Sequence, residues 1–166
     1  MGITQDTFNQ YRDNAYEGQV ANIMEADVLS RKVETAALPF GKAVVSGTGE
    51  RSCAPVGGAS TAADVIGFSV RTMAVENNSS DNAEYAIGEV ASIIKRGGLF
   101  VKCGTGGASK DASVFVVINV AGGDAIGDLR GTADGANTIE LNQVKWVDDV
   151  SADGIGEIVL NGILNA

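Results

Sequence analysis

The chain has 166 residues, 45% of them hydrophobic and 20% charged, a composition that suits one globular domain with its own core. Its net charge of −9 repels nucleic-acid phosphates and anionic membrane surfaces, so neither is expected as a partner. The 22 glycines follow no three-residue repeat and accompany only two prolines, which excludes collagen and predicts a turn-rich all-β domain.

The first residues of the chain read as an extended arm. Residues 1–14 are polar apart from Ile3, Phe8 and Tyr11, and they show neither a two-residue nor a helical period. We therefore interpret residues 1–15 as an N-terminal arm and residues 16–166 as a single β domain. The apolar side chains of such an arm need burial, which a neighbouring subunit can supply. A basic start and an apolar stretch typical of a signal peptide are missing here, so synthesis in the cytosol is expected.

Two segments in the first half have weak patterns. Residues 26–37, ADVLSRKVETAA, fit a short helix and an irregular extended segment equally well, and both interpretations stay open. Residues 47–64, GTGERSCAPVGGASTAAD, are small and polar, which predicts a long surface loop.

Clearer β signals surround these segments. Pro39 and Gly41 mark a sheet edge or a bulge in front of the β-branched residues Val44 and Val45. Residues 65–75, VIGFSVRTMAV, predict a strand because they combine β-branched side chains with partial alternation.

The middle of the chain predicts a hairpin followed by an interior strand. Residues 89–103 contain two apolar runs about Arg96-Gly97-Gly98, and glycines allow the positive φ of a tight turn. Ser113–Val120 is nearly all apolar, as expected for a strand that is covered on both faces. The glycine-rich residues 121–127 then turn the chain toward a short segment at Leu129.

The last third predicts a second hairpin, with residues 139–147 and 155–164 antiparallel across a turn at Val147–Gly154. A two-residue period in the first of these segments puts Val144 and Trp146 on one face. The same period puts five residues on the other face: Ile139, Leu141, Gln143, Lys145 and Val147.

The acidic turn of this hairpin resembles a calcium loop only in part. A register that begins at Asp149 puts Ser151 and Asp153 at liganding positions, but Leu160 occupies the twelfth position, where such a loop needs a bidentate glutamate. The flanking segments are also strands, whereas a calcium loop of this kind joins helices. We therefore expect no metal site.

Catalytic and cofactor sites are not expected either. The chain has no histidine, so Ser-His-Asp and Cys-His arrangements are impossible, and no cofactor motif is present. Residues 103–112, CGTGGASKDA, lack the P-loop spacing and precede a strand, which indicates an ordinary loop. Cys53 and Cys103 are expected to be buried free thiols rather than a disulfide.

Several stretches, taken together in order, resemble the structural cement or capsid decoration proteins of tailed bacteriophages. The resemblance covers Tyr16 to Ile163 and rests on the order and spacing of turns and strand edges. The stretches that carry it are YEGQVANI, VLSRKVETAALPFGKAVVSGT, IGFSVRT, YAIGEVASIIKRGGLFV and WVDDVSADGIGEIVLNG.

This resemblance implies a β-sandwich or jelly-roll protein on the capsid surface of the virion. Its partners would be the major capsid protein and further copies of itself, as a homodimer or a homotrimer. The implied contact surface consists of the arm, with Ile3, Phe8 and Tyr11, the bend at Leu38, Pro39 and Phe40, and parts of the loops. The alternative is a carbohydrate-binding or adhesin module, which would need exposed aromatic platforms, and the chain has only one Trp, three Tyr and five Phe.

Overall fold

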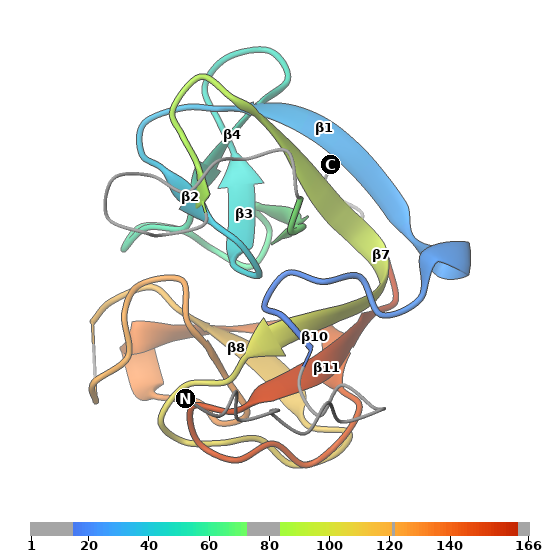
Figure 1. Ribbon diagram of the computed structural model, residues 1–166. Helices are drawn as coiled ribbons and strands as arrows, with labels where there is room; N and C mark the ends of the chain where they lie inside the picture. The colour runs from blue at the N-terminus through green and yellow to red at the C-terminus, as the bar shows by residue number, and fades with distance from the viewer. Residues whose placement is uncertain (1–14, 73–83, 121, 163–166) are drawn as a thin grey trace, which may run out of the picture.

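The computed structural model describes residues 15–72, 84–120 and 122–162, and over these ranges the chain is all-β, as predicted (Figure 1). Its regular elements are eleven strands and two short 3₁₀ helices. They are η1 (Ile23–Glu25), β1 (Asp27–Val33), β2 (Leu38–Pro39), β3 (Ala43–Ser46), β4 (Ser52–Pro55), β5 (Val65–Ser69), β6 (Glu84–Tyr85), β7 (Val90–Lys102), β8 (Ser113–Val117), β9 (Leu129–Arg130), η2 (Gly135–Asn137), β10 (Thr138–Trp146) and β11 (Ile155–Leu160).

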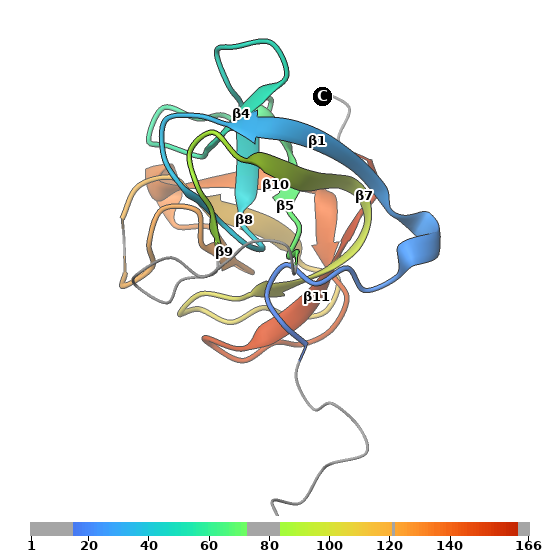
Figure 2. The same cartoon turned by 45° about the horizontal axis from the view of Figure 1, so that its top comes forward.

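Nine of the described strands form two closed rings that share β7 (Figures 1 and 2). The other two, β2 and β6, pair with each other in a separate two-stranded sheet. The first ring runs β1-β4-β3-β5-β7 and closes because β1 also pairs with β7. The second ring runs β7-β11-β10-β8-β9 and closes through a bridge between Cys103 and Leu129. In Figure 1 the first ring lies in the upper half, the second in the lower half, and β7 curves from one to the other. The resemblance implies a β-sandwich or jelly roll, and the observed pairing closes each of the two rings on itself.

The predicted hairpin at residues 89–103 is wrong, because these residues form the single long strand β7. Gly97 has a φ of +118°, which bends the strand without reversing it. The bend also lies against the N-terminal segment, since a Cβ on Gly97 would sit 3.1 Å from the Cα of Ala26. The glycines that resemble a turn therefore allow one strand to serve two rings.

The two weak segments of the first half both contain strands. Residues 27–33 form β1, which resolves the open choice between helix and extended chain in favour of the latter. The predicted loop at residues 47–64 contains β4, so that expectation is wrong in its first part. Cys53 gives the reason: its side chain is fully buried, and β4 pairs with both β1 and β3 around it. Local polarity did not reveal this long-range pairing.

The strand predicted at Ser113–Val120 is shorter than expected. β8 ends at Val117, and Val120 is 73% exposed, so the apolar run extends beyond the strand into the surface. The short segment expected at Leu129 is the strand β9, in which Leu129 is fully buried and pairs with Val116.

The C-terminal hairpin is confirmed: β10 and β11 are antiparallel, with Trp146 opposite Ile158. The facial alternation predicted for β10 is wrong in one respect, because Leu141 is buried together with Val144 and Trp146. The pairing of β10 with β8 shifts register between Leu141 and Lys145, and such a bulge changes the face that follows it.

Two hydrophobic clusters fill the fold. The smaller cluster contains Val33, Val44, Cys53, Ile66 and Ile93, all from strands of the first ring. The larger cluster fills the second ring and continues onto the outer face of the first, where Ala43, Phe68 and Ile94 join it. The two rings are therefore packed against each other rather than merely linked. Over the described residues, no helix has the length and apolarity needed to cross a bilayer.

Candidate interaction surface

The bend at residues 38–41 turns most of its apolar surface inward. Leu38 is fully buried and Phe40 is 4% exposed, with the Phe40 ring edge-on to Tyr85 at 5.2 Å between centroids. Pro39 is exposed between them. Of the three bend residues predicted to make contacts, Pro39 is thus the one whose side chain a partner can reach.

The arm residues Ile3, Phe8 and Tyr11 lie outside the described residues. The segment that follows them contacts the bend through Arg71. Tyr16 is 49% exposed, and the guanidinium carbon of Arg71 lies 5.1 Å from the centre of its ring. The same guanidinium carbon lies 5.4 Å from the centre of the Phe40 ring. Arg71 therefore connects the start of the described chain to the bend by two cation–π contacts.

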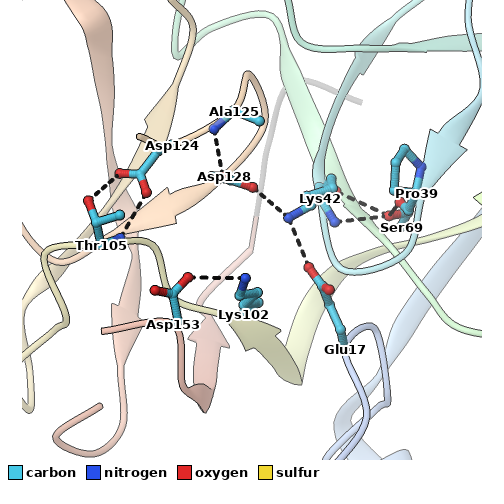
Figure 3. Close-up of polar contacts among 10 residues, drawn as sticks. All are labelled: Glu17, Pro39, Lys42, Ser69, Lys102, Thr105, Asp124, Ala125, Asp128 and Asp153. Carbon is cyan, nitrogen blue, oxygen red and sulfur yellow. Dashed lines mark hydrogen bonds and ion pairs between the residues drawn. The ribbon is translucent and has the colours of Figure 1, made fainter. Parts of the chain in front are cut away.

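A partly buried ion triad, formed by Glu17, Lys42 and Asp128, lies at the same place (Figure 3). The Nζ of Lys42 is 2.9 Å from Oε1 of Glu17 and 2.8 Å from Oδ1 of Asp128. Burial lowers the pKa of Lys42, but Glu17 and Asp128 outweigh that effect, and the net pKa is raised. The Lys42 cation therefore joins the N-terminal segment to both rings.

No local pattern in the sequence indicates this triad. Lys42 and Asp128 are 86 residues apart, and neither belongs to a recognisable motif. Lys42 lies directly before β3 of the first ring, whereas Asp128 lies directly before β9 of the second. Only the way the rings pack brings them together.

The segment before β9 also contains a buried carboxylate, Asp124, which is 3% exposed. It accepts hydrogen bonds from the backbone N–H of Thr105, at 2.8 Å, and from the Thr105 hydroxyl, at 3.2 Å (Figure 3). The oxygen that accepts from the Thr105 hydroxyl, Oδ2, is also 3.4 Å from Nε of Arg130. These contacts use the carboxylate to tie two loops together, so it has a structural role.

Exposed apolar side chains on the first ring are scattered. Val28 and Val90 are 43% and 64% exposed on the same face of β1 and β7. The polar pair Ser30 and Ser92 lies between them. This face therefore does not present a continuous apolar patch.

The acidic hairpin turn is held in place by the loop after β7. Ala108 and Val150 form a backbone bridge, and the backbone N–H of Lys110 donates to Oδ1 of Asp149 at 2.9 Å. Asp153 has a φ of +59° and its carboxylate lies 3.1 Å from Nζ of Lys102. Within the described ranges, no three His, Cys, Asp or Glu side chains are grouped closely enough to hold a metal.

Calcium is therefore expected to leave the melting temperature nearly unchanged. A ligand stabilises a protein only when it binds the folded state better than the unfolded one, and the turn carboxylates already have partners within the chain. Thermal unfolding with and without millimolar calcium measures this. A rise of several degrees that Asp153→Ala abolishes would contradict the prediction.

The two thiols are free and buried, as predicted. Burial raises the pKa of both Cys53 and Cys103 from an ordinary 9.0 to about 11. A protonated, inaccessible thiol is a poor nucleophile, so neither cysteine is suited to covalent catalysis.

These pKa values predict a loss of stability at alkaline pH. The unfolded chain ionises its thiols near pH 9.0, whereas the folded chain keeps them protonated to about pH 11. Their contribution to the free energy of unfolding is therefore complete below pH 9 and is lost as the pH rises to about 11. Urea unfolding at about pH 8 and about pH 10.5 measures this, and a variant with Cys53→Ala and Cys103→Ala should lose less stability between the two. Equal losses would contradict the prediction.

Comparison with known proteins identifies the family of the chain, which the geometry alone does not. Residues 4–161 match a phage cement family whose description is "Structural cement protein (E217 gp24/Pam3 gp6)". The chain belongs to this family. The match spans both rings, so membership applies to the whole fold, and it assigns the chain the role of cement on a phage capsid.

The fold of this cement protein is similar to a chain in a structure described as the capsid of Myoviridae phage XM1. The two chains share 16% sequence identity with a TM-score of 0.75, and the alignment covers 95% of this chain and 97% of the other. At that identity the similarity concerns the fold. No curated protein sequence matches the chain.

Proposed function

We propose that this cement protein binds the outer surface of a phage head, contacts the major capsid protein and strengthens the shell. The observation that carries the proposal is the family match over residues 4–161. The acidic net charge of −9 suits an outer surface, because it disfavours contact with the packaged nucleic acid.

The proposed contact surface combines the arm and the region where it joins the domain. Ile3, Phe8 and Tyr11 would supply apolar contacts to a neighbouring subunit, and the exposed Pro39 belongs to the bend that Gly18 approaches closely. Leu38 and Phe40 would act by shaping this bend, since their side chains are buried in the chain's own core. We further propose that the protein acts as a homodimer or homotrimer, because symmetric self-association would let several arms bind one shell.

A purely structural role fits the chemistry of the described residues. The buried carboxylate of Asp124 is fixed by hydrogen bonds, and both thiols are protonated. Most described aromatic rings face the core, including Trp146, Tyr85 and Phe68, so they do not form the platforms that a carbohydrate-binding module needs. We therefore propose a cement role without catalysis and prefer it to the adhesin alternative.

Co-sedimentation tests the proposed binding. Purified protein is mixed with expanded heads that lack it, and the amount that pellets with the heads is measured against protein concentration. We expect saturable binding at a fixed number of copies per head. Failure to pellet at any concentration, with heads intact and the protein folded, would overturn the proposal.

A further inference from the structure

The segment that follows the arm is built into the sheet. The backbone N–H of Gly18 donates to the Phe100 carbonyl at 2.8 Å, and the N–H of Phe100 donates to the Gln19 carbonyl, also at 2.8 Å. The N–H of Ala21 continues the ladder to the Gly98 carbonyl at 2.9 Å. Residues 18–21 therefore lie along the second half of β7 like an added strand, with Val20 bridged to Leu99.

Two glycines let this segment approach the bend closely. Gly18 and Gly41 have φ values of +80° and +72°. A Cβ on Gly18 would lie 2.8 Å from the Cβ of Phe40, and one on Gly41 would lie 2.9 Å from the backbone nitrogen of Gly18. Any side chain at either position would meet both a strained φ and a steric clash, so the contact is specific for glycine.

The ion triad adds a charged contact next to the close approach of Gly18 and Gly41. Lys42 follows Gly41 directly, and its Nζ binds Glu17, which precedes Gly18. The same Nζ reaches Asp128 of the second ring, and the backbone N–H of Arg71 donates to the Gly18 carbonyl at 2.7 Å. One short segment is thus attached to the residues that follow β5, to β7 and to the bend between β2 and β3, and through Lys42 to the loop before β9.

We propose that this junction, formed by Glu17, Gly18, Gly41, Lys42 and Asp128, is an anchor for the arm. It fixes the point from which residues 1–14 leave the domain, and it passes a pull on the arm to both rings at once. Fourteen residues reach at most about 50 Å when extended, so a fixed starting point decides which neighbouring subunit they meet. The anchor rests on the proposed function, in which the arm contacts a neighbouring subunit.

Positioning of this kind raises affinity without adding a contact. A segment that is held before binding loses less conformational freedom when it binds, so less of the contact energy is spent on ordering it. Residues of the junction therefore act through the arm rather than on the capsid. Loss of the anchor should weaken attachment while leaving the folded rings in place.

Hydrogen exchange tests the anchor in the isolated protein. Lys42→Met keeps an apolar side chain of similar length but removes the cation that binds Glu17 and Asp128. We expect the amides of Gly18 and Ala21 to exchange at least about tenfold faster in this variant, with the β10–β11 amides unchanged. Glu17→Gln should act in the same direction with a smaller effect, which keeps the test valid if Lys42→Met folds poorly.

Lys102→Met is the matched control, because Lys102 forms an ion pair with Asp153 at 3.1 Å on a more exposed surface of the second ring. It should leave the exchange of Gly18 and Ala21 at the wild-type rate. Unchanged exchange of these two amides in both Lys42→Met and Glu17→Gln would overturn the anchor.

Binding to heads tests whether the anchor acts through the arm. Lys42→Met is compared with the wild type, both in the natural sequence and in a full-length variant with Ile3→Ser, Phe8→Ser and Tyr11→Ser. We expect Lys42→Met to weaken binding about tenfold with the natural arm and to have no further effect when the arm side chains are changed. Equal weakening in both backgrounds would overturn the proposal, because the junction would then act independently of the arm.

The remaining outcomes separate the anchor from the proposed function. If the wild type binds heads and the three arm substitutions have no effect, the arm contact fails and the anchor fails with it. If the wild type does not bind heads at all, the cement function fails, whereas the exchange result still decides whether the junction holds residues 18–21.

Discussion

Trp146→Ala is expected to lower the free energy of unfolding by about 3–5 kcal/mol, as truncation of a large buried aromatic side chain generally does. Trp146 is fully buried in the second ring, and its indole N–H donates to the Arg130 carbonyl at 3.3 Å. The substitution would leave a cavity opposite Ile158 and remove the hydrogen bond of the indole N–H. Urea unfolding followed by circular dichroism measures the change, and the melting temperature should fall by about 2–4 °C per kcal/mol at this length.

Val120→Ala is the control for this experiment. Val120 is 73% exposed, so its truncation should change the free energy of unfolding by less than about 0.5 kcal/mol. A loss below about 1 kcal/mol for Trp146→Ala would show that Trp146 does not lie at the centre of a packed ring and would contradict the fold.

Deletion of residues 1–14 is expected to weaken attachment to heads or self-association by at least about tenfold, which corresponds to about 1.4 kcal/mol. Ile3, Phe8 and Tyr11 are large apolar side chains in a polar segment, and each buried apolar side chain contributes about 1.5–3 kcal/mol. The rings should stay folded, because their strands begin at Asp27. Binding to heads and sedimentation equilibrium of the free oligomer measure the two effects separately.

The free oligomer is needed because many weak contacts on one shell can hide the loss of a single arm. Circular dichroism of the truncated protein provides the control for folding. If the truncated protein both self-associates and binds heads as the wild type does, the arm makes no contact and the capsid-binding surface must lie in the loops.

The sequence predicted those elements whose pattern is local. The β10–β11 hairpin follows from alternation on both sides of a turn with Asp153 and Gly154, and the structure pairs these strands as expected. The all-β class follows from the abundance of glycine and the β-branched runs. Burial of Cys53 and Cys103 follows from their apolar character and the lack of metal-binding partners.

Elements that depend on distant pairing could not be predicted in this way. The glycines at 97 and 98 have the composition of a turn, and only the pairing of β7 with β1, β5 and β11 shows that they bend a continuous strand. The bulge in β10 could not be predicted from the sequence either, because it results from the register with β8.

The candidate site shows the same limit. A resemblance in the order of turns indicated the cement family, but it did not distinguish the buried Leu38 and Phe40 from the exposed Pro39. The Lys42 triad joins residues from the N-terminal segment and from both rings, so no local window of sequence contains it. Such contacts exist only once the rings have packed.

Cryo-electron microscopy of expanded heads that lack this protein, before and after its addition, tests the central claim most directly. The cement function predicts new density of the two-ring fold on the outer surface, in contact with adjacent copies of the major capsid protein, and decorated heads that withstand heating better than bare ones. Heads that stay bare at saturating concentrations of folded protein, with unchanged heat stability, would contradict it.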